Sequence, residues 1–366
     1  MASSLYTFQL ERGDSMKAEV WYGRNDVRVV DIPEPPSPPL GWVKIEVERC
    51  GICGSDLHEY VVAILIPVDK PHPLTGGTAP IILGHEFSGT IVEVGESVEG
   101  WNIAEGVAPD ACQVCWECYS CKRYNYLACE KLAFTGLHTD GAFASYVDVP
   151  AYTLCKIPDN LPFDQAVLVE PLAVGMHAVL RALVTAGDNV VIFGAGTNVL
   201  STLPCTMAAG AAKVIVVELA RARKEYAEKL GAYAVFDPTE CDVPAEVKRL
   251  TGGLGADVAI ESVGSHKTVP VALESVRPRG IVVTAGVFES DTPIQFNSVT
   301  FPEKEIKGSL AYNGDFERVI GMLNDGRLNA EMMITGRIGL DDIIEKGFQE
   351  LINNKDENIK IIVSPK

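Results

Sequence analysis

The residues best suited to chemistry in this chain gather in the stretch GICGSDLH, residues 51–58. Cys53, Ser55 and His58 bring a thiol, a hydroxyl and an imidazole close together between glycines, which leave the backbone free to bend around them. A cysteine near a histidine is more often a small core residue beside a histidine with an ordinary structural partner. The stretch therefore predicts a reactive or metal-binding site only if other segments supply matching groups.

Two later segments supply such groups. His85 and Glu86 lie in GHEFSG, directly after an apolar run typical of a strand, and Glu170 lies between apolar neighbours in LVEPL. A carboxylate in such surroundings needs a cation or a hydrogen-bonding partner. Cys53, His85 and Glu170 together form the ligand set of a catalytic zinc site, in which a fourth position is open to water or substrate. Zinc in such a site acts as a Lewis acid and lowers the pKa of a hydroxyl group that it binds.

Four cysteines in a polar segment carry the most specific motif of the sequence. They follow the pattern C-x-x-C-x-x-C-x(7)-C and are Cys115, Cys118, Cys121 and Cys129. Four thiolates at this spacing can close a tetrahedron around one zinc, which leaves no open position and makes the site structural. The alternative is four unrelated buried or redox-active cysteines, and Cys112 offers a second register. We prefer the zinc site. The apparent free energy of zinc binding to four thiolates is on the order of 10 kcal/mol, enough to fold a loop that has no hydrophobic core of its own.

Length and composition narrow the protein class. With 366 residues the chain is longer than one core usually serves, which favours two domains. We find no apolar run of the roughly 18 residues that a membrane span needs, and no signal peptide, so we expect a cytoplasmic protein without a membrane partner. The net charge of -18 opposes binding to nucleic acid or to an anionic membrane. Ten cysteines in a cytoplasmic chain indicate metal or redox chemistry before disulfides.

The first half reads as a β-rich domain. Alternating or apolar runs predict strands, and two segments rich in proline or glycine predict loops. The predicted strands lie within 17–32, 43–47, 82–94 and 144–149, and the predicted loops are 33–41 and 61–80. His72, in the second loop, is more simply an exposed histidine than a ligand. Residues 1–15 precede a second methionine and are expected to form a disordered extension.

The second half alternates strands with helices. Strands are predicted at 189–193, 213–217, 256–260 and 280–285, and helices at 172–183 and 221–230. Alternation at this period predicts a doubly wound parallel sheet, so the fold class is α/β with a β-rich first domain.

The first strand of this sheet is followed by a turn suited to a dinucleotide. Gly194 and Gly196 let the backbone approach a pyrophosphate at the start of the next helix. Glu218 ends the next strand, where a carboxylate accepts hydrogen bonds from ribose hydroxyls and repels a 2'-phosphate, so the predicted cofactor is NAD. Arg223 lies about one helical turn further on and either covers the adenine or is an ordinary surface arginine.

Two residues of the helix after this turn break the dinucleotide pattern. Val199 stands where a third glycine is expected, and overpacking by its side chain costs about 1 to 3 kcal/mol unless the helix shifts. Pro204 falls in the middle of the same helix, at a cost of about 3 kcal/mol where it is not accommodated. Both residues argue against efficient cofactor binding.

The motifs GICGSDLHEY, GHEFSG, the four-cysteine segment, VEPLAV, GAG and Glu218 occur in this order in the zinc-dependent medium-chain dehydrogenases. The chain resembles this family over about residues 16–366, and it is most similar to the branch of 2,3-butanediol and sorbitol dehydrogenases. The resemblance implies a GroES-like catalytic domain of residues 16–171 and 306–366 around a Rossmann NAD-binding domain of residues 172–305. It also suggests a homodimer or homotetramer built on the nucleotide domains.

The same resemblance assigns roles to individual residues. It implies that Cys53, His85 and Glu170 bind a catalytic zinc, with Glu86 beside it as a neighbouring or exchanging ligand, and that Ser55 and His58 form a proton relay. It implies a structural zinc on the four cysteines. The expected reaction is NAD-dependent interconversion of a secondary alcohol or vicinal diol and its ketone, with 2,3-butanediol and acetoin as the leading pair. A sorbitol, polyol or other alcohol dehydrogenase is the first alternative, and a zinc-binding protein with impaired cofactor binding and little catalysis is the second.

Overall fold

The computed structural model describes residues 15–366 except residues 195 and 355–356, and the side chains of residues 197–199 also lie outside the described part. The extension predicted at residues 1–15 therefore falls outside it apart from Ser15, which begins the first strand. The described chain forms two compact units. Unit 1 comprises residues up to Val167 with residues 336–353 and 361–366, and unit 2 comprises residues 168–335 and 354–360.

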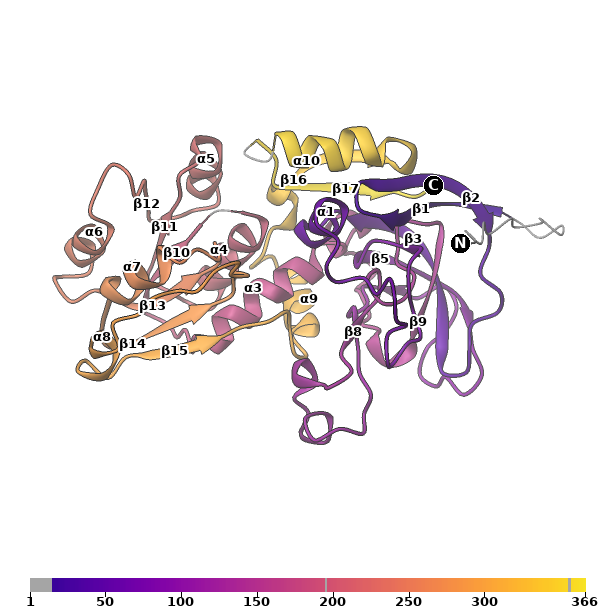
Figure 1. Cartoon of the computed structure of the whole chain (residues 1–366), viewed down its shortest axis with the longest axis horizontal. Helices are drawn as coiled ribbons and strands as arrows, with labels where there is room; N and C mark the ends of the chain where they lie inside the picture. Colours follow the sequence, from indigo (N-terminus) through magenta and orange to yellow (C-terminus); the bar gives the residue numbers. More distant parts are fainter. Residues whose placement is uncertain (1–14, 195, 355–356) are drawn as a thin grey trace. The chain divides into compact units, whose positions relative to one another are not determined.

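Unit 1 is built from β-sheets (Figure 1). Its largest sheet has the order β16 (Ile334–Gly339), β17 (Lys360–Ser364), β3 (Trp42–Gly51), β5 (Glu86–Val94) and β6 (Gly106–Val107), and β9 (Tyr146–Pro150) also pairs with β3. The smaller sheets are β2 (Asp26–Pro33), β1 (Ser15–Gly23) and β4 (Ile81–Ile82), and the pair β7 (Cys112–Gln113) and β8 (Ala133–Phe134). Its α-helices are α1 (Gly54–Val61), α2 (Phe163–Ala166) and α10 (Glu350–Asn353), and a π-helix spans Ile343–Gln349.

The alternating strands of unit 1 enclose one hydrophobic core. In β3, for example, Val43, Ile45 and Val47 are fully buried while the residues between them are partly exposed. Phe87 of β5 and Phe143 of the segment before β9 belong to the same core. Ile52, in the segment that links β3 to α1, also belongs to this core, so the core supports the residues of the first predicted site.

Unit 2 is a parallel sheet with helices on both faces (Figure 1). Its strand order is β12 (Ala234–Phe236), β11 (Lys213–Val217), β10 (Asn189–Phe193), β13 (Ala256–Glu261), β14 (Val276–Thr284) and β15 (Glu305–Gly308). The helices are α3 (Val169–Arg181), α4 (Thr197–Ala208), α5 (Arg221–Lys229), α6 (Val243–Leu250), α7 (Thr268–Ser275), α8 (Asn297–Thr300) and α9 (Phe316–Asn324). The strand order reverses at β10, so right-handed crossovers place α4 and α7 on opposite faces, as in a doubly wound dinucleotide-binding sheet.

Several element boundaries differ from the sequence expectations. The predicted strand within 17–32 is a hairpin that turns at Asn25, and the strand within 82–94 is interrupted at Gly84, whose φ is +96°. The helix predicted from residue 172 begins at Val169, so Glu170 lies in its first turn. We expected residues 306–335 to join the catalytic domain, but β15 pairs with β14 and extends the parallel sheet of unit 2.

The segment 163–181 has the length and composition of a membrane span, with a mean hydropathy of 1.3 over its most apolar window. Asp164, Glu170 and Arg181 interrupt its apolar residues, so the sequence alone predicts no continuous membrane span here. Within the described part of the chain, 67% of that window is buried, which is typical of a helix in a protein core.

Candidate zinc and dinucleotide sites

Unit 1 brings together three of the predicted site residues, Cys53, His85 and Glu86. Their potential ligand atoms all lie within 4.8 Å of one another. Cys53 caps the start of α1, and His85 and Glu86 lie where the segment after β4 enters β5. His85 and Glu86 are buried, with 6% and 1% of their surfaces exposed. A thiol, an imidazole and a carboxylate in this grouping form a donor set that suits zinc.

Two glycines make room for this arrangement. A Cβ atom on Gly51 would collide with the carboxylate of Glu86, which faces it across the β3–β5 pair. A Cβ atom on Gly84 would lie 2.7 Å from the sulfur of Cys50, and its φ of +96° is itself unfavourable for other residues. Glycine at these two positions therefore lets His85 and Glu86 enter the site from β5.

Asp56 is a site residue that the sequence reading did not assign. Its Oδ2 accepts a hydrogen bond from the backbone N–H of Cys53 at 2.8 Å, and its Oδ1 lies 3.4 Å from Nδ1 of His85. Nε2 of His85 lies 3.2 Å from the hydroxyl of Ser55. A carboxylate on one ring nitrogen orients the imidazole and directs the other nitrogen towards a metal. The sequence signal that could have identified Asp56 is its position three residues after Cys53.

The electrostatic environment of His85 favours a cation. Burial alone would lower the pKa of His85, but the charges of Asp56 and Cys53 outweigh it and raise that pKa well above its usual value. Fully buried Asp56 and Glu86 add acidic groups that a positive ion would neutralise. The residues present therefore fit a zinc ion.

Ser55 and His58 lie on α1 at a spacing of three residues, so both are on one face of the helix. Ser55 contacts His85, as described above, and both Ser55 and His58 are partly exposed. Glu170 lies in unit 2, in the first turn of α3, and is 8% exposed. Its place among the zinc ligands remains a prediction from the sequence.

Two further buried glutamates, Glu59 and Glu19, were not predicted as functional residues. Their hydrogen bonds fix segments next to α1 and His85. Glu59 accepts hydrogen bonds from the backbone N–H groups of Leu65 at 2.8 Å and of Ile66 at 3.2 Å, so it fixes the start of the predicted loop 61–80. Glu19 accepts one from Leu83, just before His85. Burial is the main reason why the pKa of Glu19 is raised well above its usual value.

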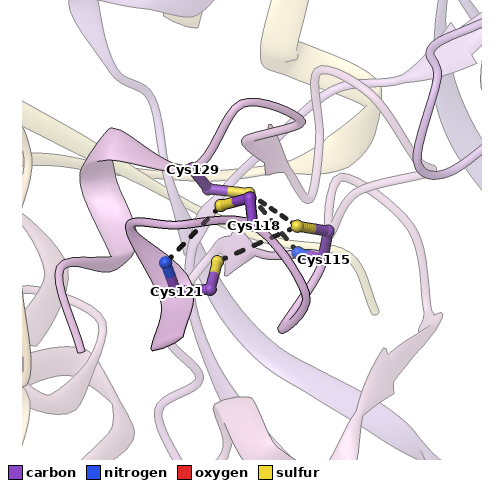
Figure 2. A group of neighbouring side chains, drawn as sticks. All are labelled: Cys115, Cys118, Cys121 and Cys129. Carbon is purple, nitrogen blue, oxygen red and sulfur yellow. Dashed lines mark hydrogen bonds between the residues drawn. The ribbon is translucent and has the colours of Figure 1, made fainter. Parts of the chain in front are cut away.

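The four cysteines predicted to bind a structural zinc form one group. Figure 2 shows their sulfur atoms turned towards one another, and all four lie within 4.8 Å of one another. The sulfur of Cys115 is 3.9 Å from that of Cys121 and 3.5 Å from that of Cys129. Four sulfurs placed about 2.3 Å from a tetrahedral zinc would be about 3.8 Å apart, so these distances fit the ion. Cys112 lies in β7 and is not a member of this group. The structure therefore favours the predicted set of four cysteines over the alternative set that includes Cys112.

Backbone N–H groups point at these sulfurs, as expected for thiolates. Cys121 N lies 3.5 Å from the sulfur of Cys118, and Lys131 N lies 3.4 Å from the sulfur of Cys129. Such hydrogen bonds, from Cys121 above all, lower the pKa of Cys118 to about 6, whereas burial raises that of Cys121 to about 12. Thiols with such different acidities cannot all be charged at neutral pH unless a metal compensates them.

The predicted dinucleotide turn lies at the carboxyl end of β10. Gly194 has a φ of +100° and its N–H donates to Val217 of β11 at 2.7 Å. Gly196 precedes α4, and a Cβ atom there would meet no described atom within 4 Å. Contacts within the described chain therefore do not require glycine at 196, whereas a pyrophosphate at the start of α4 would.

Glu218 and Arg223 occupy the expected places at the next strand and helix. Oε1 of Glu218 accepts hydrogen bonds from the N–H groups of Leu219 and Ala220, both at 2.8 Å. These bonds hold the carboxylate at the end of β11, and a carboxylate has a second oxygen that can accept a ribose hydroxyl. Arg223 is half-buried on α5.

The two residues that break the dinucleotide pattern do not stop α4. The helix continues through Pro204 from Thr197 to Ala208. Gly175 of α3 allows close contact with it, because a Cβ atom there would lie 2.8 Å from the backbone N of Thr202. Val199 lies in this helix, but its side chain is outside the described part of the chain.

Comparisons with known proteins agree with this geometry. The sequence pattern described as "Zinc-binding dehydrogenase" matches residues 200–325, and that of "Alcohol dehydrogenase GroES-like domain" matches residues 39–159. The (R,R)-butanediol dehydrogenase of Bacillus subtilis is 41% identical over 96% of this chain and 100% of its own length. The chain belongs to the zinc-dependent medium-chain dehydrogenases. The family, the two-part fold and the class of zinc-containing alcohol dehydrogenase predicted from the sequence are thereby confirmed.

Solved structures of the family show the same fold and two cofactors. The crystal structure of 2R,3R-butanediol dehydrogenase from Bacillus subtilis aligns with a TM-score of 0.91 at 40% identity, covering 96% of this chain and 100% of its own. An alcohol dehydrogenase of Escherichia coli complexed with NADH has a TM-score of 0.87 at 26% identity, with 96% and 100% covered. A zinc-binding dehydrogenase structure from Sinorhizobium meliloti, bound to NADP, has a TM-score of 0.85 at 29% identity and the same coverage.

Proposed function

We propose that this dehydrogenase interconverts a secondary alcohol or vicinal diol and its ketone with NAD, and that 2,3-butanediol and acetoin are its preferred pair. The observation that carries the substrate is the full-length similarity, at 41% identity, to a relative named (R,R)-butanediol dehydrogenase. The grouping of Cys53, His85 and Glu86 supports the alcohol chemistry.

The residues of unit 1 have separate tasks in this reaction. A bound zinc would supply Lewis acidity towards the substrate oxygen, and a bound NAD would accept the hydride. Cys53 and His85 would hold the metal, and Asp56 orients His85. The hydroxyl of Ser55 accepts the proton of the substrate hydroxyl as it passes its own proton to the imidazole of His58, one helical turn further along α1, and His58 then releases a proton to solvent.

Glu218 supports NAD rather than NADP, because its carboxylate, at the end of β11, would repel a 2'-phosphate. The structure of the relative from Sinorhizobium meliloti is bound to NADP, so the choice of cofactor needs a direct test. We expect saturable quenching of intrinsic fluorescence by NADH, much weaker quenching by NADPH, and a smaller preference in Glu218→Ala. Arg221→Ala, at an exposed position on α5, is the matched surface control.

Steady-state rates test the substrate. We expect the highest kcat/KM on a 2,3-butanediol stereoisomer, and lower values on sorbitol and on simple primary alcohols. A preference for sorbitol would favour the polyol alternative. Zinc bound in both ligand groups together with no saturable NADH binding would instead favour a zinc protein with little catalysis.

We also propose a homodimer or homotetramer that works in the cytoplasm. β15 ends the sheet of unit 2, and exposed apolar side chains surround it, namely Phe296, Phe301, Ile306 and Leu310. An unpaired edge with such neighbours suits a second copy of the chain. The ten cysteines, all within the described residues, form no disulfide there, which suits a reducing compartment. Light scattering after size exclusion should give an oligomeric mass that Phe301→Asp lowers, and a monomeric wild-type chain would contradict the proposal.

A further inference from the structure

A pocket lies wholly within unit 2, outside the residues assigned to zinc or dinucleotide. Its volume is about 430 Å³, and the second half of α3, the end of β15 and the first turn of α9 form its walls. Its polar lining consists of His177, Arg181, Lys307, Asn313, Asp315 and Arg318. None of these residues belongs to the turn after β10 or to the end of β11, so the pocket is separate from the predicted dinucleotide residues.

The charge of this pocket is opposite to that of the whole protein. The chain has 49 acidic and 31 basic residues, yet the pocket is lined by three cations and one carboxylate, and a further carboxylate outside the lining, that of Glu305, pairs with one of these cations, Lys307. On a surface with an acidic surplus, a concave site with a cationic surplus attracts small anions from solution.

Backbone and side-chain contacts hold two of the three cations in place. Nε of Arg181 donates a hydrogen bond to the carbonyl of Gly308 at 3.0 Å, which fixes its guanidinium group at the end of β15. Nζ of Lys307 lies 3.1 Å from the carboxylate of Glu305. The terminal amino groups of Arg181 are further donors in a planar fork, which matches the oxygens of a phosphate.

The carboxylate of Asp315 is already engaged inside the pocket wall. Its Oδ2 lies 2.8 Å from Nδ1 of His177 and accepts a hydrogen bond from Asn313 N at 2.9 Å. Burial would raise the pKa of Asp315, but these contacts and the charge of Arg318 lower it below its usual value. Asp315 is therefore charged, and its neighbours within the pocket neutralise that charge.

We propose that this pocket binds a small anion carrying a phosphoryl group. Two arginines and a lysine are the side chains that most often recognise a phosphate dianion, because they supply charge and several donors. The pocket is larger than a phosphate ion needs. Leu180 and Leu183, which also line it and are 38% and 62% exposed, offer an apolar wall to a short carbon skeleton. A phosphomonoester of a small metabolite matches both features.

Calorimetric titration of the full-length, zinc-loaded protein tests the proposal. The probes are inorganic phosphate and glycerol 3-phosphate, with citrate as a carboxylate comparison, all at matched ionic strength and with or without NAD. We expect saturable binding of the phosphomonoester that NAD does not displace. Arg318→Ala and Lys307→Ala should each weaken it by roughly tenfold or more, as expected for loss of a charged hydrogen-bonding partner.

Arg327→Ala is the matched control, because Arg327 is an exposed arginine just after α9 that pairs with Asp325. It removes the same charge outside the pocket and should leave the affinity unchanged. Thermal unfolding of each variant verifies that it is folded. The proposal is overturned if the phosphomonoester does not bind, if all three variants bind alike, if NAD competes with it, or if citrate binds in its place.

Discussion

The two groups of potential zinc ligands in unit 1 are supported in different ways. The segment of the four cysteines has a small core, in which Val114, Cys121 and Cys129 are the buried members. Large side chains such as Trp116 and Tyr124 remain 46% and 73% exposed around it. The ligands are themselves the core, so we infer that this segment depends on its metal to stay folded.

The Cys53 site is held by its surroundings. Ile52 and Phe87, next to its ligands in sequence, belong to the large core of unit 1, and the hydrogen bond from Cys53 N to Asp56 fixes the start of α1. Its ligand atoms are therefore positioned by packing before a metal binds. The comparison teaches that a structural metal site can replace a hydrophobic core, whereas a catalytic site needs a core that holds its ligands and leaves one position open.

The largest effect should follow from removing a ligand of the four-cysteine group. We expect Cys121→Ser to cost more than about 4 kcal/mol of stability, because loss of a structural metal belongs to the few mechanisms with effects of that size. The measurements are thermal unfolding, zinc content and limited proteolysis, and cleavage should appear within 115–131.

Cys53→Ser is the matched control, because it removes one cysteine ligand from the other group. It should abolish activity and lower the zinc content by the same amount, with little change in thermal stability. Equal destabilisation by the two substitutions would contradict the proposed difference between the sites.

A smaller effect should follow from weakening the support of His85. Asp56→Asn keeps the size of the side chain but removes the charge that faces Nδ1 of His85. We expect zinc affinity at the catalytic site, and kcat, to fall by about 10- to 100-fold, while the four-cysteine group keeps its metal. Competition with a chromogenic chelator measures the affinity. The idea fails if both zinc ions leave together, or if kcat falls while zinc affinity stays at the wild-type value.

The four cysteines, and Cys53 with His85 and Glu86, were singled out from the sequence and lie together in the structure, because metal sites restrict residue type and spacing. The spacing of the four cysteines is local, so it carries the whole site. The role of Asp56 was missed although it lies in the opening motif, because it depends on His85, which is distant in sequence and is brought close by the β3–β5 pair. Glu170 belongs to unit 2, and its role as a zinc ligand remains a prediction from the sequence.

The success of the fold prediction varied with burial. The strands at 189–193 and 213–217 were predicted to the residue, because both are buried on two faces and form continuous apolar runs. The strand predicted at 280–285 begins earlier, at Val276, because it includes Arg277 and Pro278, which the apolar pattern excludes. The tertiary pairing of β14 with β13 overrides that local signal.

The smallest predicted effect concerns the scaffold of unit 1 rather than its metals. Asp148 of β9 is partly buried, and burial, opposed by the charge of Lys44, raises the pKa of its carboxyl to about 6, from an ordinary value of 3.8. A carboxyl whose pKa is raised by folding has no effect on stability below about pH 4, where it is protonated in both states. Its cost to the stability of the folded chain grows as the pH rises from about 4 to about 6 and stays constant at higher pH.

Asp148→Asn should therefore stabilise the protein by about 1 kcal/mol at pH 7.5, after allowance for the partial exposure of the side chain, and by almost nothing at pH 4. Denaturant unfolding at the two pH values, with and without a chelator, measures this difference. The gain in stability should survive chelation, because Asp148 acts through the β3–β9 pair. The loss of stability caused by Cys121→Ser should disappear once the metal is removed from the wild-type protein and from the variant. A gain that appears only in the zinc-loaded protein would show that the core and the metal sites are not independent.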